Sequence, residues 1–230
     1  MKKFLSRILF RLAKYKFHPF RLQCLYYGYI FYGDAEKELV HLERIIDPKR
    51  LNTAIDIGAN EGFWTYKLSK FFTQVHSFEI NPNVSEVIAT SNISNIDLHD
   101  IGLSDSVAEK EFYIPINENK HIEGWGSLEK RELDFTTTFE TKRFKVTPLD
   151  SYNFKNIDFI KIDVEGHELN VLKGAKNTIL QNFPILVIES EGATLDAVKN
   201  FLLPLGYKSI LLKDILDIKG SWQNHIFIPN

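Results

Sequence analysis

The sequence predicts an α/β domain built on a mostly parallel β-sheet flanked by helices. Short apolar runs typical of buried strands alternate with segments whose apolar residues recur every three or four positions. The run at residues 53–57 leads into a glycine-containing turn and then a helical pattern, which is a strand–loop–helix unit. With 44% hydrophobic residues in a chain of 230, the composition supplies a full core for one medium-sized domain.

The distribution of charge separates the N-terminal segment from the rest of the chain. Seven of the 28 basic residues precede Asp34, the first acidic residue, so that 21 basic residues face 30 acidic residues in the remainder. An acidic body disfavours duplex nucleic acid as a partner, because proteins that bind it present a basic face. Cys24 is the only cysteine, which excludes a disulfide framework and a cysteine-based zinc knuckle and fits a reducing cytoplasm.

Residues 1–33 are expected to form a basic amphipathic extension to a domain at 34–230. From Met1 to Phe20, apolar residues recur at helical spacing with basic residues between them. Such a helix fits docking of residues 1–21 on an anionic membrane or a partner protein, and it equally fits packing over the core with a solvated basic side. We expect neither a signal peptide nor a transmembrane span, because arginines interrupt the apolar stretch and no run of ~20 apolar residues occurs.

Two segments between this helix and the first strand have their own patterns. The aromatic stretch 26–33 is expected to be a strand or a loop lid over the edge of the core, with its rings either packing there or lining a cleft. The spacing after Asp34 predicts a helix over 35–46, capped by Asp34 and ended before Pro48.

The turn after the first strand is the leading candidate for a ligand site. Such a turn presents backbone N–H groups to a polar ligand, but Gly58 and Gly62 are two glycines where the dinucleotide fingerprint has three. About 20 residues later, Glu79 ends the apolar run 75–79, where a carboxylate accepts both hydroxyls of a ribose. These features predict a nucleoside-bearing cofactor, and the alternative is a generic α/β unit whose glycines only form turns.

The rest of the chain continues the alternation, apart from one insertion. Further strands are expected at 96–101, 157–163, 184–189, 207–212 and 225–228, and further helices from 81, at 168–179 and at 194–203. Between about 104 and 148, short alternating runs flank a polar segment, which predicts an antiparallel β insertion. Within it, residues 124–128 are a candidate lid over an acceptor, and a variable surface loop is the alternative.

Acidic residues end five of the predicted strands. In an open α/β sheet, ligands bind beyond the carboxyl ends of the strands. Those ends carry Asp56, Glu79, Asp100, Asp163 and Glu189. Their crowding raises the pKa of some carboxyls and suits either deprotonation of a hydroxyl or binding of a divalent cation. The densest cluster adds Glu165 and His167 where the chain leaves a strand and enters a helix.

These motifs resemble those of the FkbM-type S-adenosylmethionine-dependent methyltransferases. The resemblance rests on the segments 56–62 (DIGANEG), 78–79 (FE), 149–151 (LDS), 160–168 (IKIDVEGHE) and 187–189 (VIE), within a match from about Asp34 to the C-terminus. It implies a class I methyltransferase (Rossmann-like) fold with a mostly parallel seven-stranded sheet, flanking helices and an antiparallel last strand. Asn60 replaces the middle glycine of the broader methyltransferase pattern, and the N-terminal helix lies outside the resemblance.

The resemblance also implies site residues, a cofactor and an acceptor. The cofactor is S-adenosylmethionine, surrounded by Asp56, Gly58, Asn60 and Gly62 at the methionine part, Glu79 at the ribose, and Asp100 with Ile101 at the adenine. The implied reaction is O-methylation of a sugar, nucleotide-sugar or surface-glycan (capsule or lipopolysaccharide) intermediate. We expect a cytoplasmic enzyme, with a peripheral position at the inner membrane face as the alternative.

Methyl transfer from a sulfonium requires the acceptor oxygen to be aligned and its proton removed. Asp163 is the first candidate for the base, followed by His167 and Glu165. His167 also fits a water-facing helix start, and Glu165 and Glu168 fit simple stabilisation of a helix N-terminus. An alternative is a magnesium or manganese ion held by Asp163, Glu165 and Glu189, which lowers the pKa of the acceptor hydroxyl.

Other functions are left open at this stage. An NAD-dependent dehydrogenase uses the same loop and Glu79 but lacks the three-glycine fingerprint. A non-catalytic cofactor-binding scaffold has the same sequence features. A nucleic-acid methyltransferase is disfavoured, because no Asn/Asp-Pro-Pro-aromatic motif follows the fourth strand.

Overall fold

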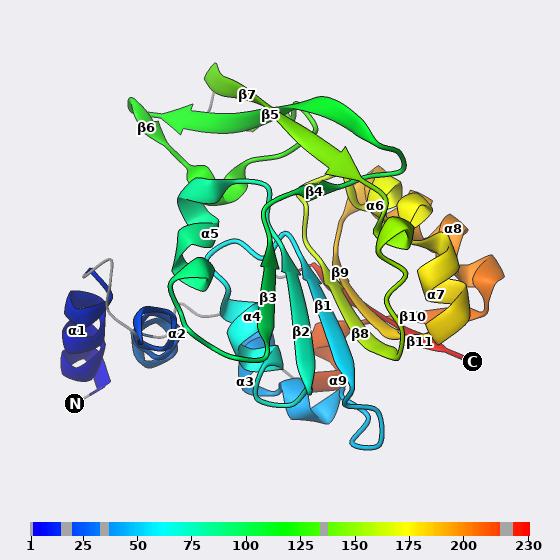
Figure 1. Cartoon of the computed structure of the whole chain (residues 1–230), viewed down its shortest axis with the longest axis horizontal. Coiled ribbons are helices and arrows are strands. Elements are labelled where there is room, and N and C mark those ends of the chain that lie inside the picture. Colours follow the sequence, from blue (N-terminus) through cyan, green and yellow to red (C-terminus); the bar gives the residue numbers. More distant parts are fainter. Residues whose placement is uncertain (1, 15–19, 33–36, 134–137, 217–222) are drawn as a thin grey trace.

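The protein is an α/β sandwich centred on a seven-stranded sheet, as Figure 1 shows. The computed structural model describes residues 2–14, 20–32, 37–133, 138–216 and 223–230. Across the sheet, the strand order is β10-β11-β9-β8-β1-β2-β3. The strands are β1 (Thr53–Ile57), β2 (Gln74–Phe78), β3 (Ile96–His99), β8 (Ile157–Ile162), β9 (Ile185–Glu189), β10 (Tyr207–Leu211) and β11 (Asn224–Pro229). Because β11 alone runs antiparallel to its neighbours β9 and β10, the predicted mostly parallel sheet with an antiparallel last strand is confirmed.

Side chains of successive residues in the central strands point to opposite faces of the sheet and so enter two separate cores. Ala54 and Phe159 pack on one face with α4 (Phe63–Leu68), α9 (Leu212–Leu216) and the N-terminal helices. Ile55 and Ile160 pack on the other face with α6 (Glu168–Gly174), α7 (Lys176–Asn182) and α8 (Gly192–Leu202). Both faces of the sheet are therefore covered, which explains the nearly continuous apolar runs of β1 and β8.

Two predicted helices differ from the structure. The helix expected at 168–179 is divided at Ala175 into α6 and α7. The division lies next to Gly174, where a Cβ atom would overlap the carbonyl oxygen of Ser104. The helix expected at 35–46 consists of α3 (Lys37–Val40) and a 3-10 turn, η1 (Leu42–Arg44), while its predicted cap, Asp34, lies outside the described residues.

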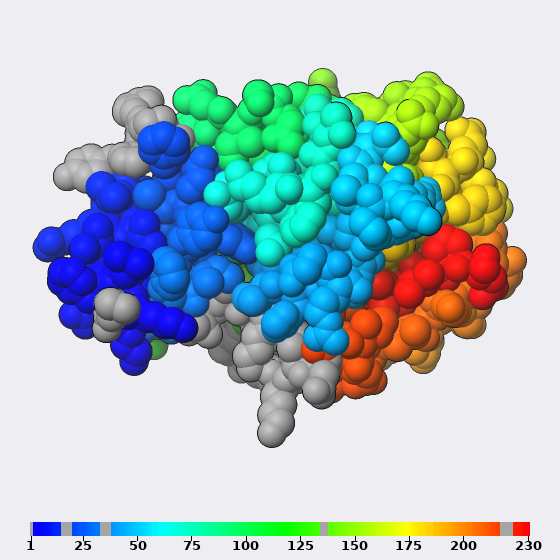
Figure 2. All heavy atoms as spheres, turned by 90° about the horizontal axis from the view of Figure 1, so that it is seen from below, coloured from blue at the N-terminus to red at the C-terminus, as the bar shows by residue number. Residues whose placement is uncertain are grey.

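The aromatic segment expected to be a strand or loop is instead the helix α2 (Arg21–Tyr32). Leu22 and Tyr26, one helical turn apart, are buried against α4, and the Tyr26 ring lies 4.9 Å from the Tyr66 ring, centroid to centroid. Aromatic residues favour strands only weakly, and this tertiary contact overrides the preference. The preceding helix α1 (Lys2–Ala13) packs on α2, and Figure 2 shows the pair forming one end of the molecule. In the described part of the chain, no helix is long and apolar enough to cross a membrane.

A second sheet lies in the region expected to be an insertion at about 104–148. Its order is β4-β7-β5-β6, formed by β4 (Gly102–Leu103), β5 (Ala108–Asn117), β6 (Lys120–His121) and β7 (Thr138–Thr147). The long hairpin of β5 and β7 is antiparallel, and it carries the loop that contains the 3-10 turn η2 (Glu123–Trp125). This loop reaches the carboxyl ends of β1, β2 and β8, where it forms part of a cavity.

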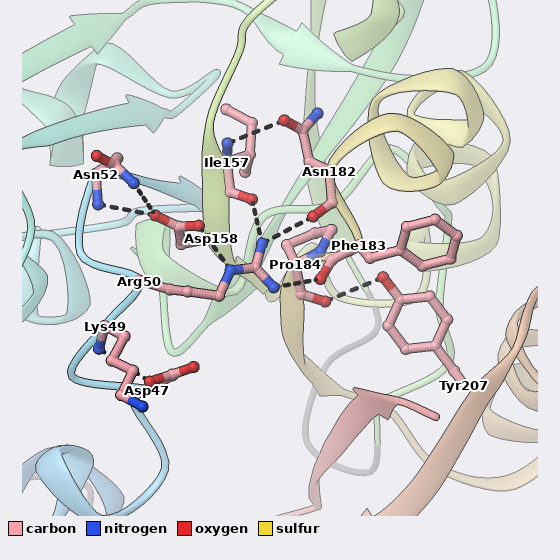
Figure 3. Close-up of polar contacts among 10 residues, drawn as sticks. All are labelled: Asp47, Lys49, Arg50, Asn52, Ile157, Asp158, Asn182, Phe183, Pro184 and Tyr207. Atoms are coloured by element: carbon pink, nitrogen blue, oxygen red, sulfur yellow. Dashed lines mark hydrogen bonds and ion pairs between the residues drawn. The ribbon is translucent and has the colours of Figure 1, made fainter.

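At the opposite end of the main sheet, Arg50 braces the amino ends of the strands, which we call the amino edge, as Figure 3 shows. Its guanidinium donates to the carboxylate of Asp158 at 3.0 Å and to the carbonyl oxygens of Asn182 and Phe183 at 2.8 and 3.0 Å. The second carboxylate oxygen of Asp158 accepts from the backbone and side-chain nitrogens of Asn52. This network joins the segment before β1 to the start of β8 and the end of α7.

Candidate active site

The turn after β1 is held between the loops that follow β2 and β8. The backbone N–H groups of Gly58 and Ala59 both donate to the carbonyl of Phe78, at 2.9 and 3.1 Å. Gly58 has a φ of 77°, and a Cβ atom on it would overlap the carbonyl oxygen of Asp163. Only glycine fits this position, because both the backbone conformation and the space exclude a side chain.

Glu79 lies directly after β2 and holds the turn in place. One of its carboxylate oxygens accepts the backbone N–H of Asn60 and the other accepts that of Asn81, each at 2.8 Å. Burial raises the pKa of Glu79 to about 7, while these two N–H bonds act in the opposite direction. A carboxylate oxygen can accept more than one hydrogen bond, so Glu79 can also accept from a ligand hydroxyl.

A cavity of about 390 Å³ opens beyond the carboxyl ends of β1, β2 and β8. Its volume is in the range of small-molecule and cofactor sites. The predicted site residues that line it are Gly58, Asn60, Glu79, Ile101, Asp163, Glu165 and Glu189. The structure thus brings together residues from five separate segments of the chain.

Three residues assigned to the cofactor do not line this cavity. Asp56 is buried beneath the turn and accepts a hydrogen bond of 2.6 Å from Thr65, and burial raises its pKa to about 6. Gly62 (φ 85°) begins α4 against Ile88 of α5 (Pro82–Ala89). Asp100 accepts a hydrogen bond of 3.1 Å from Ser85, also on α5. In the structure, these three residues support the loops around the cavity.

The insertion loop covers the cavity and is tied to both sides of it. The Glu123 carboxylate accepts from the side-chain amides of Asn81 and Asn83, at 2.8 and 2.9 Å. On the other side, the Ser127 hydroxyl donates to the carbonyl of Glu165 at 2.7 Å. The segment 124–128, expected to be a candidate lid, lines the cavity between these two ties.

A buried lysine lies under the acidic cluster. Lys161, in the middle of the apolar strand β8, has its ammonium 3.6 Å from Asp163 and 4.0 Å from Glu189, and it donates to the side-chain oxygen of Asn224 at 3.0 Å. The residue is fully buried, so its charge acts on both carboxylates through a low dielectric. A lysine between Ile160 and Ile162 in a buried strand was the sequence signal for this contact.

The residues proposed as metal ligands do not form a metal site. In the part of the chain that the structure describes, no group of three or more His, Cys, Asp or Glu side chains is arranged to hold a metal ion. Glu165 forms an ion pair with Arg131 at 2.5 Å, and Asp163 and Glu189 face the ammonium of Lys161. Because protein cations occupy the positions next to these three carboxylates, the residues do not fit a magnesium or manganese ion.

His167 is buried and does not line the cavity, which corrects the expectation of a water-facing helix start. It is buried, with one ring nitrogen 2.7 Å from the carboxylate of Glu129 and the other 3.0 Å from the hydroxyl of Ser104. Burial lowers its pKa, although Glu129 opposes this effect. The ring does not line the cavity and does not face water. Through these two contacts it joins the insertion to the start of α6.

A second, smaller cavity of about 270 Å³ adjoins the first on the side of β9. The two cavities share Arg131, Asp163, Glu165 and Glu189. In the second cavity, a carboxylate oxygen of Glu168 and the hydroxyl of Ser190 are buried without a hydrogen-bond partner among the described residues. Burial raises the pKa of Glu168. No sequence motif marks Ser190 or Arg131, and only the fold brings them to this cavity.

Comparison with known proteins finds a matching family model and similar solved structures. A family model, the methyltransferase FkbM domain, matches residues 56–209. The solved structure of a methyltransferase FkbM from Methylobacillus flagellatus KT is 18% identical with a TM-score of 0.55, and the match covers 96% of this chain and 58% of that chain. This chain therefore spans less than two thirds of the length of that protein.

Two further solved structures are similar at lower scores. One is precorrin 8W decarboxylase from Methanobacterium thermoautotrophicum, with 13% identity, a TM-score of 0.47 and coverage of 85% of this chain and 91% of that chain. The other is a protein from Streptococcus mutans in complex with SAH, with 14% identity, a TM-score of 0.48 and coverage of 84% and 98%. No curated protein matches the sequence. The match of the family model to residues 56–209 shows that this chain belongs to the FkbM methyltransferase family.

Proposed function

We propose that this protein transfers a methyl group from S-adenosylmethionine to a hydroxyl of a sugar, nucleotide-sugar or surface-glycan intermediate. The observation that carries the proposal is the pair of adjoining cavities with Asp163 at their junction. One cavity has the features of a nucleoside site, and the other presents carboxylates to a polar ligand. A residue shared by both is in place to act where the two ligands meet.

The residues of the first cavity fit S-adenosylmethionine. The overlap that a side chain at Gly58 would cause shows how closely the backbone is packed there, and the oriented carboxylate of Glu79 provides acceptors for the two ribose hydroxyls. In this proposal, Gly58 and Asn60 hold the methionine part, and Ile101 contacts the adenine. When bound, the cofactor supplies an electrophilic methyl group on a sulfonium.

The second cavity favours a ligand rich in hydroxyl groups. Carboxylates accept hydrogen bonds and donate none, and each hydroxyl of a sugar is a donor. The unpartnered oxygen atoms of Glu168 and Ser190 gain partners when such a ligand binds, which removes the cost of leaving them buried and unpaired. A phosphate or carboxylate group is disfavoured at this place, because it would lie next to several acidic side chains.

Asp163 is the base in this proposal. It is the acidic residue at the end of β8, it lines both cavities, and the Lys161 ammonium 3.6 Å away orients its carboxylate. Taking the proton from the acceptor hydroxyl as the new bond forms is expected to contribute about 10²–10⁴-fold to the rate. Glu165 is less suited to this step, because its carboxylate is paired with Arg131.

The test is to measure cofactor binding first and methyl transfer second. Isothermal titration of the full-length protein with S-adenosylmethionine should show binding, and titration with NAD should not. Nucleotide sugars and glycans are then incubated with protein and cofactor and analysed by mass spectrometry for the mass increase of one methyl group. Binding of NAD without S-adenosylmethionine would contradict the proposal, and cofactor binding without a methylated product across the panel would indicate a scaffold.

A further inference from the structure

Helix α1 is attached to the molecule by one face only. Ser6 and Ala13 are its buried residues, and Phe10 packs against α2, with its ring 5.1 Å from the Tyr29 ring, centroid to centroid. A Cβ atom on Gly28 of α2 would lie 2.8 Å from Phe10, so the glycine permits this close approach. The packed face thus consists of small residues and one aromatic ring.

A stripe of four large apolar residues is exposed on another face of α1. Phe4, Leu5, Ile8 and Leu12 have relative exposures of 69, 42, 40 and 36%. At ~100° per residue, these four positions fall within an arc of about 100°, turned well away from Ser6 and Ala13. A helix of a soluble protein normally buries such a stripe in the core, and here the stripe is on the outside.

Basic residues border this stripe. Lys3, Arg7, Arg11 and Lys14 follow one another at intervals of three or four, and the helix contains no acidic residue. Arg7, Arg11 and Lys14 also line a hollow of about 440 Å³ together with Phe4, Ile8 and Phe10. An apolar floor with a cationic border matches the two parts of an anionic phospholipid, its acyl chain and its phosphate.

We propose that α1 docks this protein on a membrane surface that contains anionic phospholipids. The apolar stripe enters the boundary between headgroups and acyl chains, and the basic residues contact the phosphates. Charge complementarity identifies the occupant, because every charged residue of the helix is basic. The exposed apolar stripe beside these charges is the arrangement of helices that lie in a membrane interface, and α1 lies at one end of the molecule, as Figure 2 shows. The cavities of the candidate active site lie elsewhere, over the carboxyl ends of the strands.

The test is cosedimentation of the full-length protein with vesicles of phosphatidylcholine alone, or with phosphatidylglycerol added to about one third. We expect binding to the anionic vesicles, weakened by added salt, and little binding to the neutral ones. Two double variants separate the contributions: Phe4→Ser/Ile8→Ser removes half of the stripe, and Arg7→Gln/Arg11→Gln removes two charges. Each should reduce partitioning to anionic vesicles roughly tenfold.

The matched control is Lys173→Gln/Lys176→Gln, which removes the same charge from exposed positions on α6 and α7. It should bind anionic vesicles like the unchanged protein. All variants are compared by thermal unfolding, and since none alters the buried residues Ser6 and Ala13, they should unfold at nearly the same temperature. Equal loss of binding in the control, binding that ignores lipid charge, or a dimer in solution that Phe4→Ser/Ile8→Ser dissociates would each overturn the proposal.

Discussion

The amino and carboxyl edges of the main sheet, where its parallel strands begin and end, differ in how completely their charged groups are paired. At the amino edge, Arg50 bonds to Asp158 and to several carbonyl oxygens, and both oxygens of Asp158 have partners. At the carboxyl edge, burial raises the pKa of Glu79, Glu165 and Glu168, and one oxygen of Glu168 has no hydrogen-bond partner in the part of the chain that the structure describes. One sheet therefore carries a network that stabilises the fold and a cluster that is prepared for a ligand.

This difference fits a structural role for the amino edge and a ligand-binding role for the carboxyl edge. A buried charge with all its partners holds segments together, whereas a buried acceptor with a free lone pair costs stability until a ligand supplies a donor. Asp158, near the start of β8, and Glu168, which follows the turn after β8, are examples of the two kinds of carboxylate. Substitutions at the two edges should accordingly separate stability from activity.

The largest expected effect is that of Asp163→Asn. Asparagine keeps the shape of the side chain and cannot take the acceptor proton, so turnover should fall by about 10²–10⁴-fold. Cofactor affinity, measured by titration, should change little. The same substitution at the other edge, Asp158→Asn, is the matched control and should preserve turnover per folded molecule. Undiminished turnover of Asp163→Asn would remove this residue from the reaction.

The next effect is the loss of stability in Arg50→Met. The substitution leaves one carboxylate oxygen of Asp158 and three carbonyl groups without the Arg50 donor. Because Arg50 is partly exposed, we expect the free energy of unfolding to fall by about 2–3 kcal/mol. Urea denaturation measures this change. Turnover should stay the same, and adding Asp158→Asn to Arg50→Met should cost less than the sum of the two single changes. Full additivity would show that the two side chains do not interact.

An intermediate effect is the pH dependence of cofactor affinity through Glu79. Its raised pKa of about 7 means that roughly one tenth of the carboxyl is ionised at pH 6, so affinity for S-adenosylmethionine should be roughly tenfold lower there than above pH 8. Titration calorimetry across this range measures it. Glu79→Gln should bind weakly with a flat profile, and a wild-type affinity that does not rise with pH would contradict the assigned role.

The free energy of unfolding should also depend on pH through Glu79, but this contribution should fall as the pH rises, whereas cofactor affinity should increase. Between its ordinary pKa of 4.5 and about 7, Glu79 holds more of the proton in the folded than in the unfolded state. Its contribution to the free energy of unfolding is thus fully present below this window and is lost as the pH rises through it. Denaturation of the unchanged protein and of Glu79→Gln at matched pH values tests the sign.

The smallest expected effect is that of Glu168→Gln. The change neutralises a buried carboxyl with one unpartnered oxygen, so the free energy of unfolding at pH 8 should rise by up to about 1 kcal/mol. Acceptor KM should increase several-fold, because one acceptor for a ligand hydroxyl is lost. A destabilisation of more than about 2 kcal/mol would place Glu168 with the structural network instead.

Much of the fold and part of the site were predictable, and the failures have local causes. The glycine turn, Glu79 and the acidic residue after β8 could be located because the order of elements sends all parallel strand ends to one edge. His167 could not be placed from the sequence, because sequence spacing does not say which side of a turn a ring occupies, and its partners Ser104 and Glu129 come from the distant insertion. The metal set failed for the same reason, since Arg131 and Lys161 reach those carboxylates only in the folded chain.

The sequence by itself determined the α/β class, the strand alternation and the family, because apolar periodicity and short motifs are local properties of the chain. Tertiary structure alone decided that the aromatic segment is the helix α2, that a helix breaks where Gly174 meets Ser104, and that two cavities meet at Asp163. These outcomes depend on contacts between residues far apart in the sequence, where packing and the pairing of buried charges outweigh local preference.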